Sequence, residues 1–395
     1  MMRLLFVDDD PRVLDGLRQS LRTKRKLWEM VFAVGPTVAL ERLAEGPFDA
    51  VISDMRMPIL DGAGLLKRVQ ELQPQALRIV LSGQMDEFAA VRAAAVAHRF
   101  LVKPCDSEML IATLSAALDL RAQLNSDEMR ECIGGMTGLP SLPRSCAELN
   151  LALEREDAGI ATIAKIVEGD VGMAAKLLQL VNSAFFGLSR RIVNIEQAVS
   201  YLGTGVVRSL VIGNAFFEQL LGGDVQLLEA ELRHSVLAAK YAKAFELGGS
   251  AKDIAVTAAF LHNVGRLALI SKLPDEYNAN REYAKQHGLT IEEAERTRLG
   301  VTHSAVGAHL LGLWGLPREV IEAVGSPATP VSELRVLDAS AVVRLTDILA
   351  GKALGRSDYA EIELPADALA RLGVSAVVAG ILRDIDATRS VVGAA

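Results

Sequence analysis

The hydrophobic and polar positions follow different patterns in the two halves of the chain. In the first part, up to about residue 120, short apolar runs alternate with amphipathic segments. The runs are, in chain order, "LLFV", "EMVFAV", "DAVIS", "RIVLS" and "RFLV". Short apolar runs bounded by polar residues and separated by helix-like segments are typical of β-α units. The pattern predicts an α/β fold, a five-stranded parallel and doubly wound sheet with helices on both faces.

The second half shows helical spacing almost throughout. A stretch rich in Gly and Pro, "IGGMTGLPSLPRS" at residues 133–145, marks the boundary. Beyond it, apolar residues recur every three or four positions, as in "AAKLLQLVNSAFF" and "SVLAAKYAKAF". Residues 336–395 continue this spacing. The pattern predicts an all-α second domain.

Polar side chains that can carry chemistry follow the predicted strands. They are Asp8, Asp9 and Asp10 after the first run, Asp54 after the third, Ser82 after the fourth and Lys103 after the fifth. The carboxyl ends of parallel strands meet at one edge of a sheet, so these side chains can converge. Crowded carboxylates repel one another unless a cation joins them, and Mg²⁺ suits an oxygen-rich site. An aspartate beside Mg²⁺ can attack a phosphoryl group, with a lysine and a hydroxyl offsetting the charge that develops.

Residues 1–122 resemble the receiver domain of two-component response regulators. The motifs that carry this resemblance are "VDDD", "SDMRMPILDG", "VLSG" and "LVKPC". The resemblance implies that Asp54 is the phosphoacceptor. It also implies a Mg²⁺ site formed by Asp54, the acidic pair Asp8 and Asp9, and the carbonyl of Arg56, with Asp9 the more direct ligand of the pair.

The same resemblance assigns three residues to a switch. Ser82 is the switch hydroxyl, at a position where the family has Thr, and Lys103 pairs with the phosphate. Phe100 occupies the aromatic switch position, and it can also serve as a core aromatic. A phosphoryl group adds up to about two negative charges and new acceptor oxygens. Ser82 and Lys103 can turn toward these oxygens and so repack the neighbouring face of the domain.

Histidines are concentrated in the helical half. The candidates for a polar or metal site are His234, His262, His303 and Asp347, from separate predicted helices. Such residues can bind a metal inside a helix bundle. We interpret His287, which precedes a glycine, as a surface residue. His309 shares a predicted helix with His303 but not its face, so we interpret it as structural.

Residues 138–335 resemble the HDOD module, a relative of the HD and HD-GYP phosphohydrolases. The most specific segments are "LVNSAFFG" and "WGLP". The parent enzymes use His, then His-Asp, then a distant Asp, and here the matching residues are His234, His262 with Asn263, and Asp347. Asn263 is neutral, so it cannot share charge between two cations as a bridging Asp does.

Other differences from the parent enzymes also indicate a loss of catalytic function, as the change from Asp to Asn263 does. Arg266 stands where many active relatives have lysine, and residues 322–328 read "EAVGSPA" in place of a histidine pair. No "GYP" signature is present. We therefore expect a degenerate, non-catalytic site with no cofactor. The alternative is a metal-dependent phosphodiesterase or phosphohydrolase with an altered ligand set.

Composition disfavours several further functional classes and cellular locations. The net charge of −7 disfavours a generic nucleic-acid binder. Two interpretations of Arg190, Arg191 and Arg208 stay open. They form a local basic patch that binds nucleic acid, or they are ordinary solvated arginines on a helical surface. The three cysteines lack zinc-type spacing, and the first residues meet acidic side chains too early for a signal peptide. These features, with no evident membrane-spanning run, favour a cytoplasmic protein.

We expect four segments along the chain. They are a receiver domain at 1–122, a helical connector at 123–137, an HDOD domain at 138–335 and a helical extension at 336–395 that packs on the HDOD domain. The resemblance implies a response regulator that a histidine kinase or small phosphodonor phosphorylates. The signal would reach the helical half through residues 106–135 or by direct docking of the two domains. The helical half would then pass the signal to an unidentified downstream protein. A homodimer through the receiver fits the family.

Overall fold

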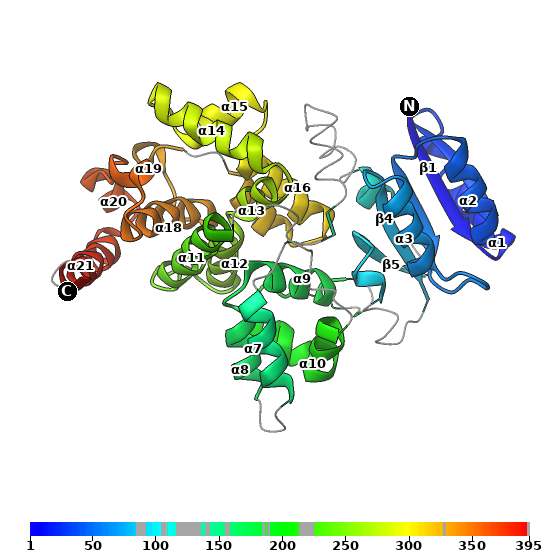
Figure 1. Ribbon diagram of the computed structural model, residues 1–395, viewed down its shortest axis with the longest axis horizontal. Helices are drawn as coiled ribbons and strands as arrows, with labels where there is room; N and C mark the ends of the chain where they lie inside the picture. Colours follow the sequence, from blue (N-terminus) through cyan, green and yellow to red (C-terminus); the bar gives the residue numbers. More distant parts are fainter. Residues whose placement is uncertain are drawn as a thin grey trace.

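The chain folds into an α/β domain and a helical domain that lie side by side (Figure 1). This computed structural model describes residues 1–83, 92–103, 108, 110–115, 136–137, 139, 143–154, 159–183, 186, 188, 190–212, 225–326 and 329–392. The N-terminus lies in the α/β domain, and the C-terminal helix lies at the opposite end of the molecule.

The α/β domain is built on the predicted parallel sheet. Its strands are β1 (Met2–Asp8), β2 (Trp28–Val34), β3 (Ala50–Asp54), β4 (Leu77–Ser82) and β5 (Arg99–Val102). The strand order is β2-β1-β3-β4-β5 and every pair is parallel. The prediction of a doubly wound, five-stranded sheet is therefore confirmed. Strands β3 and β4 are buried along their whole length, because helices cover both faces.

Local sequence explains where the first helices begin. The connecting elements are α1 (Pro11–Ser20), η1 (Arg22–Lys24), α2 (Gly35–Glu45) and α3 (Gly62–Leu72). The Asp10 side chain accepts a hydrogen bond from the backbone of Arg12 and so caps α1. Asp61 caps α3 in the same way, and a Cβ at Gly62 would overlap the Asp54 carbonyl oxygen. Gly62 thus lets α3 begin directly against the end of β3.

The second domain is helical throughout its described residues, as predicted. Its helices are α7 (Pro143–Glu154), α8 (Ile160–Val167), α9 (Val171–Val181), α10 (Ile195–Ile212), α11 (Val225–Ala242), α12 (Ser250–Leu261), α13 (Val264–Lys272), α14 (Pro274–His287), α15 (Ile291–Arg298), α16 (His303–Leu313), α17 (Arg318–Gly325), η3 (Val331–Glu333), α18 (Ala339–Ala353), α19 (Ser357–Ala360), α20 (Ala366–Arg371) and α21 (Ser375–Val392). Helices α7 to α10 pack together, and α18 packs against α11 and α12.

Two glycines bring α13 and α16 unusually close. A Cβ at Gly265 would overlap the backbone of His303, and Gly307 lies against Gly265 from the other helix. Two helices can approach to backbone contact only where side chains are absent. This crossing places Arg266 of α13 beside His303, the first residue of α16.

The segment Ser250–Lys272, which covers α12 and α13, is long and apolar enough to cross a membrane by length and composition. However, 89% of its most apolar window is buried inside the protein. It is therefore placed as a core helix pair of the helical domain.

The two domains touch through the beginning of β5. The Arg99 guanidinium donates hydrogen bonds to the carbonyl oxygens of Gly312 (2.5 Å) and Leu313 (3.2 Å) at the end of α16. The Gln179 side chain of α9 donates to the carbonyl oxygen of His98 at 3.1 Å. Direct docking between the domains, one of the two predicted routes of communication, is thus present. Residues 84–91 and most of the predicted connector lie outside the described residues.

Candidate functional site

The first candidate site is a candidate phosphoacceptor pocket, called the phosphoacceptor pocket below, formed by Asp8, Asp54, Ser82 and Lys103 at the carboxyl ends of the strands. Lys103 follows β5, and its ammonium lies 2.5 Å from a carboxylate oxygen of Asp8 and 2.5 Å from one of Asp54. Both aspartates are buried. The structure therefore brings together the acids and the lysine that the sequence placed at separate strand ends.

Ser82 has an unsatisfied hydroxyl in this pocket. Its Oγ is buried and, among the described residues, makes no hydrogen bond. Its carbonyl accepts a hydrogen bond from the backbone of Lys103 at 2.8 Å, so sheet pairing holds the backbones of these two residues side by side. A buried hydroxyl without a partner is costly. Acceptor oxygens of a phosphoryl group on Asp54 would satisfy it.

The charges of the pocket are coupled. Burial raises the pKa of Asp54, although hydrogen bonding and attraction from Lys103 act in the opposite direction. Burial alone would lower the pKa of Lys103, but its hydrogen bonds to Asp54 and Asp8 outweigh burial and raise it. Two buried carboxylates thus share a single ammonium, so the pocket has room for further positive charge.

The residues present fit a magnesium ion. Asp8 and Asp54 supply buried carboxylates, and exposed Asp9 lies at the start of the adjoining loop. The backbone N–H of Arg56 donates to the second carboxylate oxygen of Asp54 at 2.8 Å, which fixes that carboxylate beside the Arg56 backbone. Oxygen donors and an uncompensated negative charge are what Mg²⁺ requires. Phe100, on β5, is buried in the domain core.

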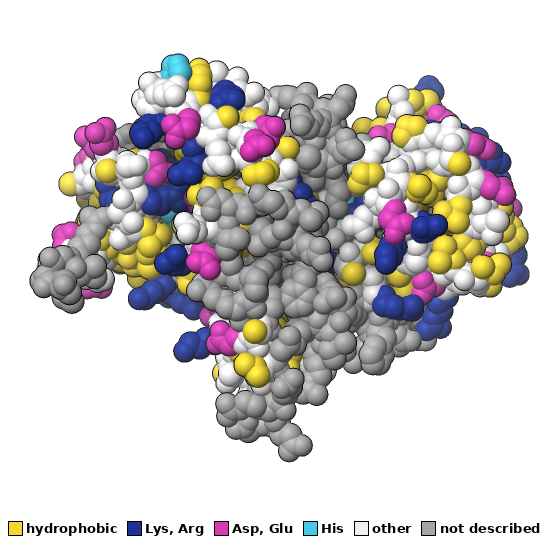
Figure 2. All heavy atoms as spheres, in the orientation of Figure 1, with side chains coloured by type: hydrophobic (Ala, Val, Ile, Leu, Met, Phe, Trp, Pro, Cys, Tyr) yellow, Lys and Arg dark blue, Asp and Glu magenta, His cyan; other side chains and the backbone are white. Residues whose placement is uncertain are grey.

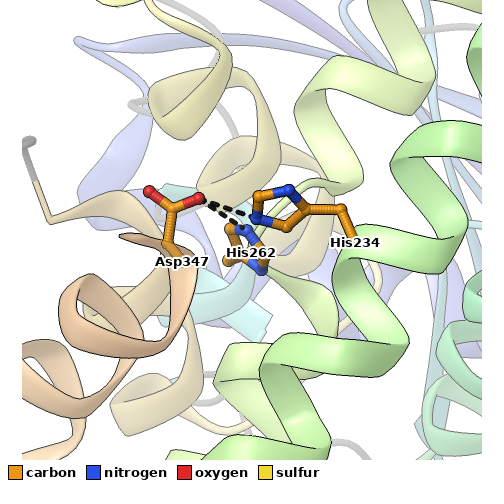
Figure 3. Close-up of side chains that lie close together, drawn as sticks. All are labelled: His234, His262 and Asp347. Carbon is orange, nitrogen blue, oxygen red and sulfur yellow. Dashed lines mark hydrogen bonds and ion pairs between the residues drawn. The ribbon is translucent and has the colours of Figure 1, made fainter. Parts of the chain in front are cut away.

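The second candidate site is the central network of the helical domain, which starts at His234, His262 and Asp347. These residues come from α11, the end of α12 and α18, and Figure 3 shows both imidazoles directed at one carboxylate oxygen. The His234 Nε2 lies 3.0 Å and the His262 Nε2 3.3 Å from Asp347 Oδ1. The Tyr359 hydroxyl donates to the same oxygen at 2.7 Å. These three candidate residues, which the sequence placed on separate helices, therefore lie together.

The partners of each ring fix the tautomers. The Nδ1 of His262 faces the carbonyl oxygen of Ala259 at 2.7 Å, so it must carry a hydrogen. The Nδ1 of His234 faces a guanidinium nitrogen of Arg356 at 3.4 Å, so it accepts and its Nε2 donates to Asp347. Burial lowers the pKa of His234, which keeps it neutral. Burial would also raise the pKa of Asp347, yet the hydrogen bond from His234 and the proximity of His262 hold that pKa well below its usual range.

Glu231 is the acidic centre of the network. It is fully buried on α11, three residues before His234. Its carboxylate accepts from Arg356 at 2.8 Å and from the Asn263 amide at 3.0 Å, and Arg266 lies 3.8 Å away. Burial alone would raise the pKa of Glu231, but the nearby guanidiniums of Arg266 and Arg356 lower it to about 2. The carboxylate therefore stays charged.

This arrangement explains Asn263. Its amide N–H group must face Glu231, because a charged carboxylate only accepts hydrogen bonds. An Asp at this position would place a second carboxylate against Glu231. The arginines Arg266 and Arg356 therefore supply, within the protein, the positive charge that metal ions supply in a two-metal centre.

The network extends to His303 through Arg266. The Arg266 Nε donates to the His303 Nε2 at 3.2 Å, and the His303 Nδ1 donates to buried Glu295 at 2.7 Å. Among the described residues, His303 is linked to His234 through Arg266, Glu231 and Arg356, and it does not lie in the His–His–Asp cluster. His309 is buried elsewhere on α16 and His287 is exposed, as predicted.

Sequence reasoning missed four members of the network, Glu231, Glu295, Arg356 and Tyr359. Glu231 had a signal, since it lies one helical turn from His234 and a charged residue on that face must be buried with it. Arg356 and Tyr359 had none, because they lie in α19 and the loop before it, where no periodic pattern shows which face is buried. Arg190 and Arg191 are exposed, and the side chain of Arg208 lies outside the described residues.

The fold and the acid–lysine pocket together define a phosphoacceptor-type α/β domain joined to a helical domain. Comparison with known families gives the particular domains. Residues 4–115 match the response regulator receiver domain and residues 139–330 match the HDOD domain. The chain is thus a receiver-domain response regulator with an HDOD output domain.

Curated relatives match parts of the chain. An uncharacterised protein of Treponema pallidum is 28% identical over 189 residues, which cover 47% of this chain and 37% of that protein. The hydrogenase transcriptional regulatory protein HoxA of Bradyrhizobium diazoefficiens is 34% identical over 121 residues, 30% of this chain and 24% of HoxA. The chain therefore spans less than two fifths of either relative's length.

Solved structures are similar in the same regions. The signal receiver domain of an HD domain-containing protein from Pseudomonas fluorescens is 33% identical, covers 30% of this chain and 94% of its own, and has a TM-score of 0.29. The MmoQ response regulator of Methylococcus capsulatus is 22% identical, covers 62% of this chain and 98% of its own, and has a TM-score of 0.49.

Replacing Glu231 by Gln tests the central network. The substitution leaves Arg266 and Arg356 buried without their carboxylate, so we expect it to lower the free energy of unfolding by about 3–5 kcal/mol. The pKa of Glu231 is depressed by folding, so its contribution is fully present above pH 4.5, the ordinary pKa of Glu, and is lost as pH falls toward 2. Urea unfolding followed between pH 2 and pH 7 measures both effects.

The matched control is Glu229→Gln on the same helix. Glu229 forms a 3.7 Å ion pair with Arg233 near the surface, so its loss has little effect. Equal stability of the two variants at pH 7 would contradict the role given to Glu231. The role would also be contradicted if the free energy of unfolding of Glu231→Gln fell with acidic pH as it does in the wild type.

Proposed function

We propose that this protein is a response regulator whose Asp54 is phosphorylated in the presence of Mg²⁺, and whose HDOD domain acts as a non-catalytic interaction module. The observation that carries the proposal is the phosphoacceptor pocket. It combines a buried Asp54, a lysine that bridges two carboxylates, and the unsatisfied hydroxyl of Ser82. In this role Asp54 attacks the phosphoryl donor, Lys103 pairs with the transferred group, and Ser82 donates to it. Bound Mg²⁺, held by Asp8, Asp9, Asp54 and the Arg56 carbonyl, would offset the charge of the phosphoryl oxygens.

The internal arginines of the central network support a non-catalytic output domain. Arg266 and Arg356 already neutralise Glu231, and Asn263 presents N–H groups to that carboxylate. A second metal ion there would meet positive charge in place of a bridging carboxylate. The parental two-metal hydrolysis is therefore not the function that this arrangement favours.

The interdomain contact supplies a route for the signal. Strand β5 ends next to Lys103 in the phosphoacceptor pocket and begins at Arg99, which binds the last carbonyls of α16. Helix α16 begins at His303, which belongs to the central network. A shift of β5 on phosphorylation would thus change the position of α16. Partial negative charge at a helix C-terminus favours the Arg99 cation.

The remaining assignments accompany this proposal. We propose the domain boundaries 1–122, 123–137, 138–335 and 336–395, a cytoplasmic location, and a histidine kinase or small phosphodonor as the source of the phosphoryl group. The helical extension supplies Asp347 and Tyr359 to the central network, which supports its assignment as part of the same folded unit. A downstream protein would bind the HDOD domain, and the receiver domains of two chains would form any homodimer.

Phosphorylation of Asp54 is the first prediction from this proposal. Incubation with acetyl phosphate and Mg²⁺ should retard the wild-type protein on a Phos-tag gel, and Asp54→Ala should abolish the retarded band. Asp15→Ala, which removes an exposed carboxylate of α1, should leave the band intact. An unshifted wild type, or a shift that survives Asp54→Ala, would rule out Asp54 as the phosphoacceptor.

The interdomain route can be measured with Trp314. The indole of Trp314 is buried and donates to the Met136 carbonyl next to the Arg99 contact, and Trp28→Phe leaves it as the sole tryptophan. Loss of the Arg99 hydrogen bonds should weaken docking by about 1.5–3 kcal/mol. We therefore expect Arg99→Gln to shift Trp314 emission to longer wavelength. Phosphorylation should also change this emission, and the change should be absent in Arg99→Gln.

The matched control for this experiment is Arg68→Gln, which removes an exposed arginine of α3 that pairs only with Glu71 among the described residues. Emission that responds equally to both substitutions would argue against the Arg99 contact as the route. So would a phosphorylation-dependent change that persists in Arg99→Gln.

A second candidate function is metal-dependent phosphoester hydrolysis at a single ion. It is favoured by one observation, that ligand atoms of His234, His262 and Asp347 all lie within 4.8 Å of one another. This candidate predicts one transition-metal ion per purified chain, lost in His262→Ala, together with turnover of bis(p-nitrophenyl) phosphate that the same substitution abolishes. Elemental analysis of chelator-free protein decides the point, and metal-free wild-type protein without turnover would eliminate this candidate.

A further inference from the structure

A half-open cleft of about 800 Å³ lies on the outer side of the central network. Arg266 and Tyr277 line it from α13 and α14, and Arg356 and Tyr359 line it from the region of α19. Figure 2 shows Lys and Arg side chains gathered between α14 and helices α18 and α19, with acidic side chains beside them. Neither the receiver chemistry nor the non-catalytic interaction role uses this cleft.

Arg266 brings unused hydrogen-bond donors to the cleft. The side chain is 5% exposed, and among the described residues only its Nε donates a hydrogen bond, to His303. Its Nη1 is buried without a hydrogen-bond acceptor, and the nearest carboxylate oxygen, of Glu231, lies 3.8 Å away. A guanidinium has five N–H donors, and leaving most of them unpaired in a buried position is costly. The geometry therefore calls for an additional acceptor.

The acids deep in the cleft are already paired. Glu231 binds Arg356 and Asn263, and Asp347 binds His234, Tyr359 and Arg344. Asp358 pairs with Arg356 at 3.0 Å, and the half-buried Glu292, which also lines the cleft, accepts from the Ser304 hydroxyl at 2.6 Å. These carboxylates therefore do not compete for the open donors of Arg266.

The mouth of the cleft carries two more cations. Arg281 and Lys285 lie one turn apart on α14, line the cleft, are exposed, and make no ion pair among the described residues. The acids Glu282 and Glu361 also line the rim, but they are exposed, so water and salt screen their repulsion. An anion would thus meet cations at the entrance and a guanidinium with open donors at the floor.

We propose that this cleft is a binding site for a small phosphate ester, and that Arg266, Arg281 and Lys285 bind its phosphate. A guanidinium presents paired donors that match phosphate oxygens, and a phosphate supplies the several acceptors that Arg266 lacks. The cleft is of the size that holds a small ligand, and Tyr277 and Tyr359 supply aromatic surface for the organic part of the ester. The site is separate from Asp54, so the HDOD domain would receive a second, chemical input.

The test is calorimetric titration of full-length Asp54→Ala in EDTA, which removes phosphoryl chemistry and Mg²⁺ from the receiver domain. The probes are inorganic phosphate, adenosine monophosphate and adenosine. We expect saturable binding of phosphate and of adenosine monophosphate at one site per chain, and no binding of adenosine. Adenosine that binds as well as its monophosphate would overturn the proposal, as would the absence of saturable binding by both phosphates.

Variants locate the site. Arg281→Ala/Lys285→Ala changes only exposed side chains, so it should fold normally and weaken binding at least fivefold. Lys240→Ala/Lys243→Ala removes two exposed cations elsewhere and should leave binding unchanged. Arg266→Lys keeps the positive charge but loses the paired N–H donors of the guanidinium, so it should weaken binding further. Equal loss in both double variants would show a non-specific charge effect and refute the site. Because Asp54 is absent throughout, these results do not depend on whether the receiver is phosphorylated.

Discussion

The buried carboxylate of Glu231 and the two guanidiniums beside it form the interaction on which the helical domain depends. A charge inside a protein is tolerated only when it is paired and hydrogen-bonded. Glu231 meets this condition through Arg356 and Asn263, and Arg266 adds a second cation. These residues come from α11, from α13 and the residue before it, and from the loop before α19, so the pairing also fixes how these segments pack. The close approach of α13 and α16 at Gly265 serves the same arrangement, because it holds Arg266 next to His303.

The contact between the domains has a different physical basis. Arg99 is half-buried against α16 and makes no ion pair with a carboxylate among the described residues, and burial lowers its pKa to about 10. The cation is held by carbonyl oxygens at the end of a helix, where each hydrogen bond is strong but the charge is only partly balanced. Gly315, in a left-handed conformation with φ 77°, lies directly against the guanidinium. Such a contact stabilises docking only modestly.

The sequence predicted the receiver site well because its logic is topological. Once the strands were placed, the carboxyl-end rule brought Asp8, Asp54 and Lys103 together without further information. In the helical domain, spacing and resemblance found His234, His262 and Asp347, but they did not show why Asn263 is present. That reason depends on Glu231, whose burial follows from the packing of several helices. The role of Arg356 could not be predicted for a similar reason. A short helix after a glycine has no hydrophobic periodicity that would show whether the Arg356 side chain is buried.

Both domains contain buried carboxylates, and the two domains balance the charge of these carboxylates in different ways. In the receiver, Asp8 and Asp54 share a single lysine, so one negative charge stays unbalanced by these three residues, which favours a cation. In the helical domain, Arg266 and Arg356 balance Glu231 from within the chain, and the histidines and Tyr359 satisfy Asp347. A site with residual charge can bind and react, whereas a site with balanced charge is structural. The donors of Arg266 that remain open are the exception in the helical domain, and they favour an anion there, in contrast to the cation favoured at Asp54.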